Sequence, residues 1–183
     1  MKGFLVFLFL MVGFSSHSQN GIPAKKLLED ALLKAKAEKK NVFVIVTATW
    51  CGPCKELKRG ITDVYISPFF EKHYVFLELY ESELGENKKN ENEGTHDILI
   101  AFKGDTTAVP YWFILNSNSV KLADSYIYKK NPKDPLEKPQ SGFSSNPDDL
   151  MAFIKVLKRT SKLTDQELQL ISERFLQLTR AVD

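Results

Sequence analysis

The chain has 183 residues, of which 43% are apolar, and this is enough to build one sizeable core. Lys and Arg total 25 against 23 Asp and Glu, so the net charge is +2. A balance this even gives no indication of a nucleic-acid partner. We therefore expect a single globular domain.

The first 18 residues have the pattern of a targeting signal. Lys2 precedes an apolar run, 4–14, that is too short to span a bilayer, and Ser16-His17-Ser18 supplies a small-x-small cleavage site. An uncleaved membrane anchor is the alternative. The sequence thus predicts a signal peptide over 1–18 and a mature domain over 19–183.

Helical and strand patterns alternate after this leader. A helical apolar face follows Pro23 and ends before Asn41, where the continuous β-branched and aromatic run 42–46 is typical of a buried central strand. A second strand is expected over 74–80, and the segments 111–115 and 120–128 are expected to pair as a hairpin.

The remaining segments are loops and helices. Residues 81–95 are dominated by polar residues and glycine, which indicates a solvated insertion and favours a plain mobile loop before a short helix near 97–102. Three prolines within 129–146 predict an extended surface loop. Two helices follow, one with a start signal at 146–148 and one with a capping box formed by Thr164 and Glu167.

The chain contains two cysteines, both in the motif Trp50-Cys51-Gly52-Pro53-Cys54 directly after the predicted central strand. Pro53 suits the first turn of a helix, so the motif is placed at a strand-to-helix junction. An exported chain with one close cysteine pair and no framework of structural disulfides suggests redox chemistry.

The spacing of the two cysteines suits thiol-disulfide exchange. Residues three apart on a helical turn have Cβ atoms roughly 5 to 6 Å apart, close to disulfide geometry. Cys51 comes first, where the helix N-terminus favours a thiolate, so we assign it as the nucleophile and Cys54 as the resolving thiol. The alternative is half of a metal site, but zinc takes about four ligands and only His73 and His96 follow the leader, so no metal site is predicted.

The order of these elements resembles the thioredoxin family: a strand, a CxxC at a helix N-terminus, a second strand, a helix, a proline heading a hairpin, and a covering helix. The resemblance runs from Ala24 to Leu157 and is strongest over 50–54. It is closest to exported thioredoxin-like proteins in which a helix precedes the central strand. It implies an α/β, thioredoxin-like fold with a central mixed β-sheet flanked by helices, and leaves 164–180 as an extra C-terminal helix.

The resemblance also implies roles around the cysteines. Val109-Pro110 aligns with the family's cis-proline, beside which the backbone pairs with an extended substrate, although an X-Pro bond is by base rate trans. Gly52 and Pro53 shape the turn and are similar to the reducing thioredoxin type. Trp50, which as a lone aromatic could simply fill the core, is expected to shape the site.

Two positions depart from the family pattern. Tyr111 follows the proline where many thioredoxins have Thr, so we expect a more aromatic groove beside the site. Ile45 lies six residues before Cys51, where thioredoxins commonly have a buried Asp that shuttles a proton. Glu78 on the following strand, or water, could replace it, but we favour an outward-facing strand glutamate and leave Glu78 out of the predicted site.

The sequence hypothesis is therefore a thiol-disulfide oxidoreductase, without cofactor, that reduces disulfides in exported proteins or peptides. The resemblance implies a bacterial periplasm, and an oxidising compartment requires a membrane-borne thiol donor to recharge the enzyme. One alternative is a disulfide oxidase or isomerase. Another is a redox-silent peptide-binding module on the same fold.

Overall fold

The structure is a computed structural model that describes residues 21–126, 142–144 and 146–180. The predicted signal peptide, 1–18, lies outside the described residues. Along the chain the elements are α1 (Ala24–Glu38), β1 (Asn41–Thr47), α2 (Gly52–Ile61), α3 (Ser67–Glu71), β2 (Tyr74–Tyr80), the 3-10 helix η1 (Gly85–Asn90), α4 (Thr95–Ala101), β3 (Tyr111–Leu115), β4 (Lys121–Asp124), α5 (Pro147–Thr160) and α6 (Asp165–Arg180).

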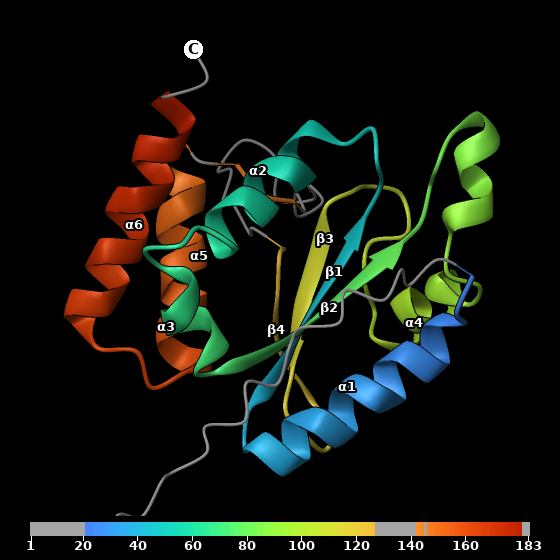
Figure 1. Ribbon diagram of the computed structural model, residues 1–183, viewed down its shortest axis with the longest axis horizontal. Coiled ribbons are helices and arrows are strands. Elements are labelled where there is room, and N and C mark those ends of the chain that lie inside the picture. Colours follow the sequence, from blue (N-terminus) through green and yellow to red (C-terminus); the bar gives the residue numbers. More distant parts are fainter. Residues whose placement is uncertain (1–20, 127–141, 145, 181–183) are drawn as a thin grey trace, which may run out of the picture.

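The four strands form one mixed sheet in the order β2-β1-β3-β4 (Figure 1). β1 is parallel to β2 and antiparallel to β3, and β3 is antiparallel to β4. β1 is central and is buried from its second residue onward, which is what a continuous apolar run predicts for a strand covered on both faces. Helices cover both faces, so the predicted thioredoxin-like fold class is confirmed.

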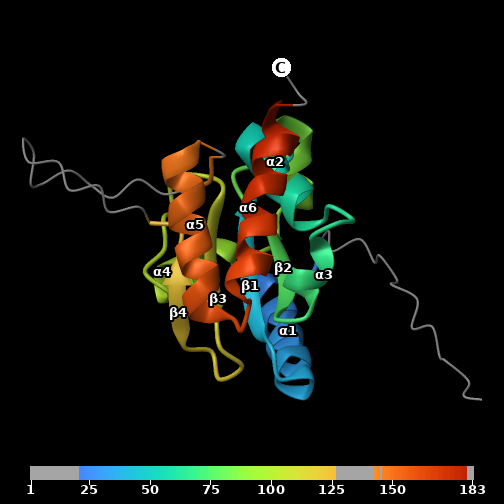
Figure 2. The same cartoon turned by 90° about the vertical axis from the view of Figure 1, so that its left-hand side faces the viewer.

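Alternate side chains of β1 enter two separate cores. Val42, Val44 and Val46 pack with α1 and α4 on one face, whereas Phe43 and Ile45 pack with α2, α3, α5 and α6 on the other. Figure 2 shows α5 and α6 side by side on this second face. That core is rich in aromatic rings, and four of them pack edge-to-face on Phe153, namely those of Phe43, Trp112, Phe143 and Phe175.

Both predicted start signals of the C-terminal helices are confirmed. The Asn146 side chain accepts the backbone N–H of Asp149 at 2.9 Å at the start of α5. Thr164 and Glu167 form a reciprocal capping box at the start of α6, with the Glu167 N–H donating to Thr164 Oγ1 at 3.2 Å and the Thr164 N–H donating to Glu167 Oε2 at 2.7 Å.

Among the described residues, no helix is both long and apolar enough to cross a membrane.

Several local expectations need correction. The short helix α3 is not among the expected elements; Pro68 lies in its first turn, where its missing N–H costs nothing. The hairpin is shorter than predicted, since β4 begins at Lys121 and ends at Asp124; residues 127 and 128 lie outside the described residues. The segment 81–95 contains η1 and is held by side-chain hydrogen bonds rather than being a plain loop.

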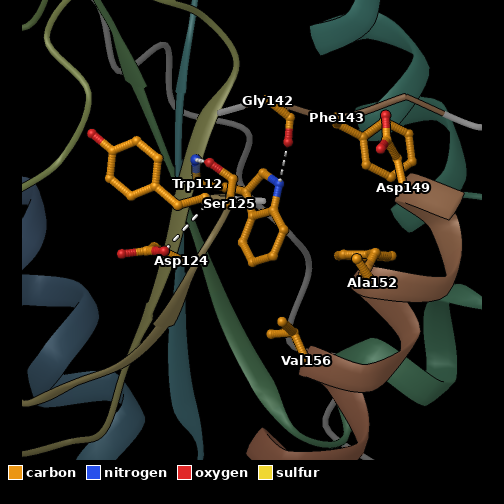
Figure 3. A pocket seen from close by; sticks show the side chains of 10 residues that line it. Trp112, Asp124, Ser125, Gly142, Phe143, Asp149, Ala152 and Val156 are labelled. Atoms are coloured by element: carbon orange, nitrogen blue, oxygen red, sulfur yellow. Dashed lines mark hydrogen bonds between the residues drawn. The ribbon is translucent and has the colours of Figure 1, made fainter. Parts of the chain in front are cut away.

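The predicted surface loop 129–146 lies mostly outside the described residues, but its described end reaches the core. The Trp112 indole N–H donates to the carbonyl of Gly142 at 3.1 Å, and the Phe143 ring packs against Phe153 at a centroid distance of 5.5 Å (Figure 3). Phe143 is buried in the α5 and α6 core. This end of the segment is therefore a structural anchor rather than an exposed loop.

An ion pair fastens α6 to the turn after α2. Arg174 donates from Nε to Asp63 Oδ1 at 3.0 Å and from Nη2 to Oδ2 at 2.8 Å, and its guanidinium lies over the Tyr65 ring at 4.8 Å. The Arg174 hydrogen bonds lower the pKa of Asp63, with smaller contributions from the Tyr65 N–H and the Arg174 charge. Because its pKa is lower in the folded than in the unfolded state, the carboxylate stabilises the fold at pH values above its unfolded-state pKa of about 4. This stabilisation is lost as the pH falls through the folded-state pKa.

We expect Asp63→Asn to lower the urea midpoint of unfolding at about pH 7. The gap from wild type should narrow as the pH falls below about 4, the unfolded pKa, and close below the lower folded-state pKa, where wild-type Asp63 is itself protonated. Urea titrations across this pH range measure the gap. Asp165→Asn is the matched control, since Asp165 pairs with Lys158 but is 81% exposed. A gap that stays constant down to about pH 2 would contradict this assignment.

Tyr111 does not make the active-site groove aromatic, and that expectation is wrong. Its side chain is fully buried in the core beneath α1 and α4, because Tyr111 alternates with Trp112, which takes the opposite face. The Tyr111 hydroxyl is buried and makes no hydrogen bond of normal geometry with the described residues. Burial, and to a smaller extent the nearby Asp124 carboxylate, raises its pKa.

We expect Tyr111→Phe to raise the free energy of unfolding by about 1 kcal/mol, because it removes a buried polar group without breaking a hydrogen bond. Urea denaturation with an unchanged slope is the measurement. Destabilisation by Tyr111→Phe would show that the hydroxyl makes an interaction in solution.

Candidate active site

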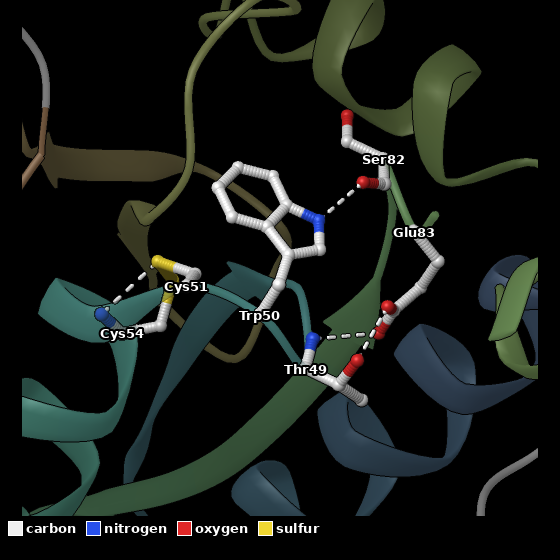
Figure 4. Close-up of a disulfide and its surroundings, with 6 residues drawn as sticks. All are labelled: Thr49, Trp50, Cys51, Cys54, Ser82 and Glu83. Atoms are coloured by element: carbon white, nitrogen blue, oxygen red, sulfur yellow. Dashed lines mark hydrogen bonds between the residues drawn. A yellow bond between two sulfur atoms is a disulfide. The ribbon is translucent and has the colours of Figure 1, made fainter. Parts of the chain in front are cut away.

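The cysteine motif occupies the turn between the central strand β1 and the helix α2 (Figure 4). Cys51 is the N-cap residue of α2, with extended backbone angles of φ −75° and ψ 110°, and Pro53 lies in the first turn. Cys51 and Cys54 are joined by a disulfide, with their Cα atoms 5.3 Å apart. The predicted junction and the predicted pairing of the two cysteines are both present.

The sulfur of Cys51 lies at the N-terminus of α2. The backbone N–H of Cys54 donates to Cys51 Sγ at 3.1 Å, so the sulfur takes the place that an oxygen takes in an ordinary helix cap. The unpaired N–H groups of a first helical turn carry partial positive charge. This arrangement stabilises a thiolate on Cys51 when the disulfide is reduced.

The disulfide is covered rather than exposed. Cys51 is 1% and Cys54 3% exposed, and both pack in a small apolar cluster with Ala48 against the partly buried Val109. The Val109–Pro110 peptide bond is cis, as the resemblance predicted. The segment before β3 therefore packs directly against the cysteine pair.

Trp50, Gly52 and Pro53 form the exposed surface beside the cysteines. Trp50 is 51% exposed and donates from Nε1 to the carbonyl of Ser82 at 2.8 Å, so it does not fill the core. Gly52 and Pro53 are also exposed. A Cβ at Gly52 would meet nothing within 4 Å, so close packing does not require glycine there.

Residues outside the predicted set bind the turn between β1 and α2 that carries the cysteine motif. The carboxylate of Glu83 accepts both the backbone N–H and the hydroxyl of Thr49, the residue before Trp50 (Figure 4). Glu83 is 2% exposed although it lies in the segment expected to be solvated. The composition of 81–95 did not distinguish Glu83 as a buried residue, since that segment contains several other glutamates.

Glu78 points toward the helix that carries the cysteines, which corrects the outward-facing expectation. It lies opposite Ile45 in the β1–β2 register, and its carboxylate accepts Lys58 Nζ at 2.8 Å and the Tyr80 hydroxyl at 3.3 Å. Burial alone would lower the pKa of Lys58, but the hydrogen bond and charge of Glu78 raise it overall. Lys58 lies one helical turn after Cys54, so a charged pair flanks this helix.

No group of three or more His, Cys, Asp or Glu side chains that could hold a metal ion occurs within the described parts of the chain. The arrangement of Cys51 and Cys54 at a helix N-terminus is instead suited to forming and breaking a disulfide.

Several solved structures are similar to this chain. A disulphide isomerase from Xylella fastidiosa Temecula1 matches with 14% identity, 94% of this chain and 99% of that chain covered, and a TM-score of 0.45. The thioredoxin Deadhead of Drosophila melanogaster has 20% identity over 57% of this chain and 82% of that chain, with a TM-score of 0.38. The C-terminal domain of Neisseria meningitidis DsbD has 15% identity over 74% and 97%, with a TM-score of 0.40.

No curated protein matches the sequence. A family model described as thioredoxin-like matches residues 24–117, just over half of the chain, from α1 through β3. The matched region contains the disulfide and the cis-proline, whereas α5 and α6 lie beyond it. This chain therefore belongs to the thioredoxin-like family and is a thiol-disulfide oxidoreductase.

Proposed function

We propose that this protein is exported and reduces disulfides in exported proteins or peptides, with Cys51 as the nucleophile and Cys54 as the resolving thiol. On this proposal residues 1–18 are a signal peptide and 19–183 a single mature domain, and the compartment is a bacterial periplasm. Trp50, Gly52, Pro53, Val109 and the buried Pro110 line the groove in which the substrate docks.

The proposed reaction has two exchange steps. The Cys51 thiolate attacks one sulfur of the substrate disulfide, forms a mixed disulfide with it and releases the other substrate sulfur as a thiolate, which takes up a proton. Cys54 then loses its proton and attacks Cys51 Sγ, which forms the Cys51–Cys54 disulfide and releases the second substrate thiolate. Two electrons pass from the protein to the substrate, and a membrane-borne dithiol donor restores the reduced cysteines by the reverse exchange.

One observation supports the division of roles above all others: the N–H of Cys54 donates to Cys51 Sγ at the start of α2. The same donor and the helix dipole favour negative charge on Cys51, the sulfur that must attack the substrate disulfide first. Cys54 is held one turn further into the helix, within reach of the mixed disulfide.

The reduction potential of the Cys51/Cys54 couple tests the direction of electron flow. Equilibration of the mature protein with dithiothreitol or glutathione mixtures should give a value near the thioredoxin end of the scale, about −270 mV. A value near about −120 mV would support a disulfide oxidase instead. Failure to form the intramolecular disulfide would support the redox-silent binding module.

A trapping variant tests the substrate class. Cys54→Ser keeps the attacking thiol but removes the resolving one, so we expect it to accumulate mixed disulfides with exported proteins through Cys51. The matched control is the double variant with Cys51→Ser, which should trap nothing. Recovery of no reducible adduct from Cys54→Ser would contradict the proposal of protein substrates.

A further inference from the structure

Glu83 is a buried carboxylate whose two oxygens both bind one residue of the active-site loop. Oε1 accepts the backbone N–H of Thr49 at 2.7 Å, and Oε2 accepts the Thr49 hydroxyl at 2.6 Å. Thr49 itself is exposed, so the loop would otherwise be held at this point by little packing. Charge-assisted hydrogen bonds of this length are among the stronger ones in proteins.

The segment that carries Glu83 is in turn fixed to the body of the domain. The Glu83 N–H donates to Glu91 Oε1 at 2.7 Å, and Asn92 accepts the Tyr80 N–H at 2.8 Å and donates to the carbonyl of Ile22 at 3.0 Å. The next residue's carbonyl, that of Glu93, accepts the first N–H of α1 at 2.8 Å. Glu83 thus connects the active-site loop to β2 and the start of α1.

A second bond from the same segment reaches the next residue of the loop. The Ser82 carbonyl accepts Trp50 Nε1 at 2.8 Å, so Ser82 and Glu83 hold Trp50 and Thr49 side by side (Figure 4). Cys51 follows directly and caps α2. The position of the Cys51 sulfur relative to the helix N–H groups depends on the path of these two residues.

We propose that Glu83 is a positioning residue for thiol-disulfide exchange, which holds Thr49 and Trp50 so that Cys51 stays at the N-terminus of α2. The inference rests on the proposal that Cys51 is the attacking thiol. A substitution far from the reacting atoms that displaces them by about 1 Å can lower the rate about a hundredfold. The loss of an anchor two residues from the nucleophile should therefore have a measurable effect.

Two substitutions of Glu83 separate its hydrogen bonds from its charge. Glu83→Gln removes the charge, but its amide oxygen can accept the Thr49 N–H while its NH₂ donates to the Thr49 hydroxyl. Glu83→Ala removes the charge and both bonds. Any difference between the two therefore reports the hydrogen bonds, and Glu86→Ala, an exposed glutamate in the same segment, controls for the general loss of an acidic side chain.

The measurement is the rate at which each reduced variant exchanges with a small aromatic disulfide, together with the pH midpoint of Cys51 alkylation. We expect Glu83→Ala to react roughly tenfold more slowly than wild type, with a higher alkylation midpoint than Glu83→Gln. Glu83→Gln should stay within about threefold of wild type, and Glu86→Ala should match wild type. A wild-type rate in Glu83→Ala, or equal losses in both Glu83 variants, would overturn the proposal.

Hydrogen exchange of the Thr49 amide gives an independent readout that needs no activity. We expect faster exchange in Glu83→Ala than in Glu83→Gln, because only the former frees the N–H. If Glu83→Ala does not fold, Thr49→Val keeps the backbone bond to Glu83 and removes the two hydrogen bonds of the hydroxyl, to Glu83 and from Asn87. It should slow disulfide exchange by about threefold; an unchanged rate would overturn the proposal. Absence of Cys51 reactivity in wild type would instead be a failure of the proposed function.

Discussion

Cys51→Ser is expected to lower the rate of disulfide reduction by a factor of at least about a thousand, because a serine hydroxyl is not ionised at neutral pH and cannot form the mixed disulfide. Insulin reduction in the presence of dithiothreitol, followed by turbidity, measures the loss. The fold should be retained, since the disulfide closes a loop of only two intervening residues and such loops stabilise little.

Cys54→Ser is the matched control for this loss. It should still consume one equivalent of a small disulfide through Cys51 and then stop, whereas Cys51→Ser should consume none. If Cys54 proved to be the faster thiol in alkylation, the assignment of nucleophile and resolving thiol would be reversed, and equal behaviour of the two variants would contradict it. The hydrogen bond from Cys54 N–H to Cys51 Sγ argues for Cys51 as the nucleophile.

The sheet and its helices could be predicted because local patterns carried the information. The run 42–46 is apolar at every position, and only a strand covered on both faces accommodates that. The capping residues Asn146 and Thr164 mark helix starts by hydrogen bonds to residues three positions later. Both partners of such a bond lie in one short stretch of sequence, so the pattern can be recognised there. The same is true of the cysteine spacing and its place at a strand-to-helix junction.

The features that escaped prediction depend on contacts between distant segments. Glu83 does not differ in type or neighbourhood from the other glutamates of its segment, and its burial follows from meeting Thr49, 34 positions earlier. Phe143 follows a proline-rich stretch that indicates a surface loop, yet it packs against Phe153 and Phe175. The composition of each segment gives no indication of either contact.

Tyr111 shows a different kind of error. Its neighbour Pro110 belongs to the active-site side, and the expectation placed the tyrosine beside it in the groove. Side chains of a strand alternate between faces, and β3 begins at Tyr111, so the ring enters the core beneath α1 and α4. Strand parity, applied from the start of β3, would have placed it correctly.

Gly60→Ala is expected to destabilise the protein by about 2 kcal/mol, the middle of the range for overpacked cores. Gly60 lies in α2, where alanine would normally be favoured over glycine by about 1 kcal/mol. A Cβ there would lie 2.0 Å from Cε1 and 2.2 Å from Cζ of Phe175, a buried ring of α6. The ring cannot move freely, because it also packs against Phe70, Phe143 and Phe153.

The matched control is Gly52→Ala in the same helix, where a Cβ would meet nothing within 4 Å and stability should change little. Phe175→Leu should cost stability in the wild type by leaving a cavity, but should cost less in the Gly60→Ala background, where the smaller side chain relieves the overlap. Urea unfolding of the four proteins in this cycle measures the coupling. Additive effects would show that α6 can shift away from α2, whereas strong coupling would show that α6, which lies outside the family match, fixes the helix that carries both cysteines.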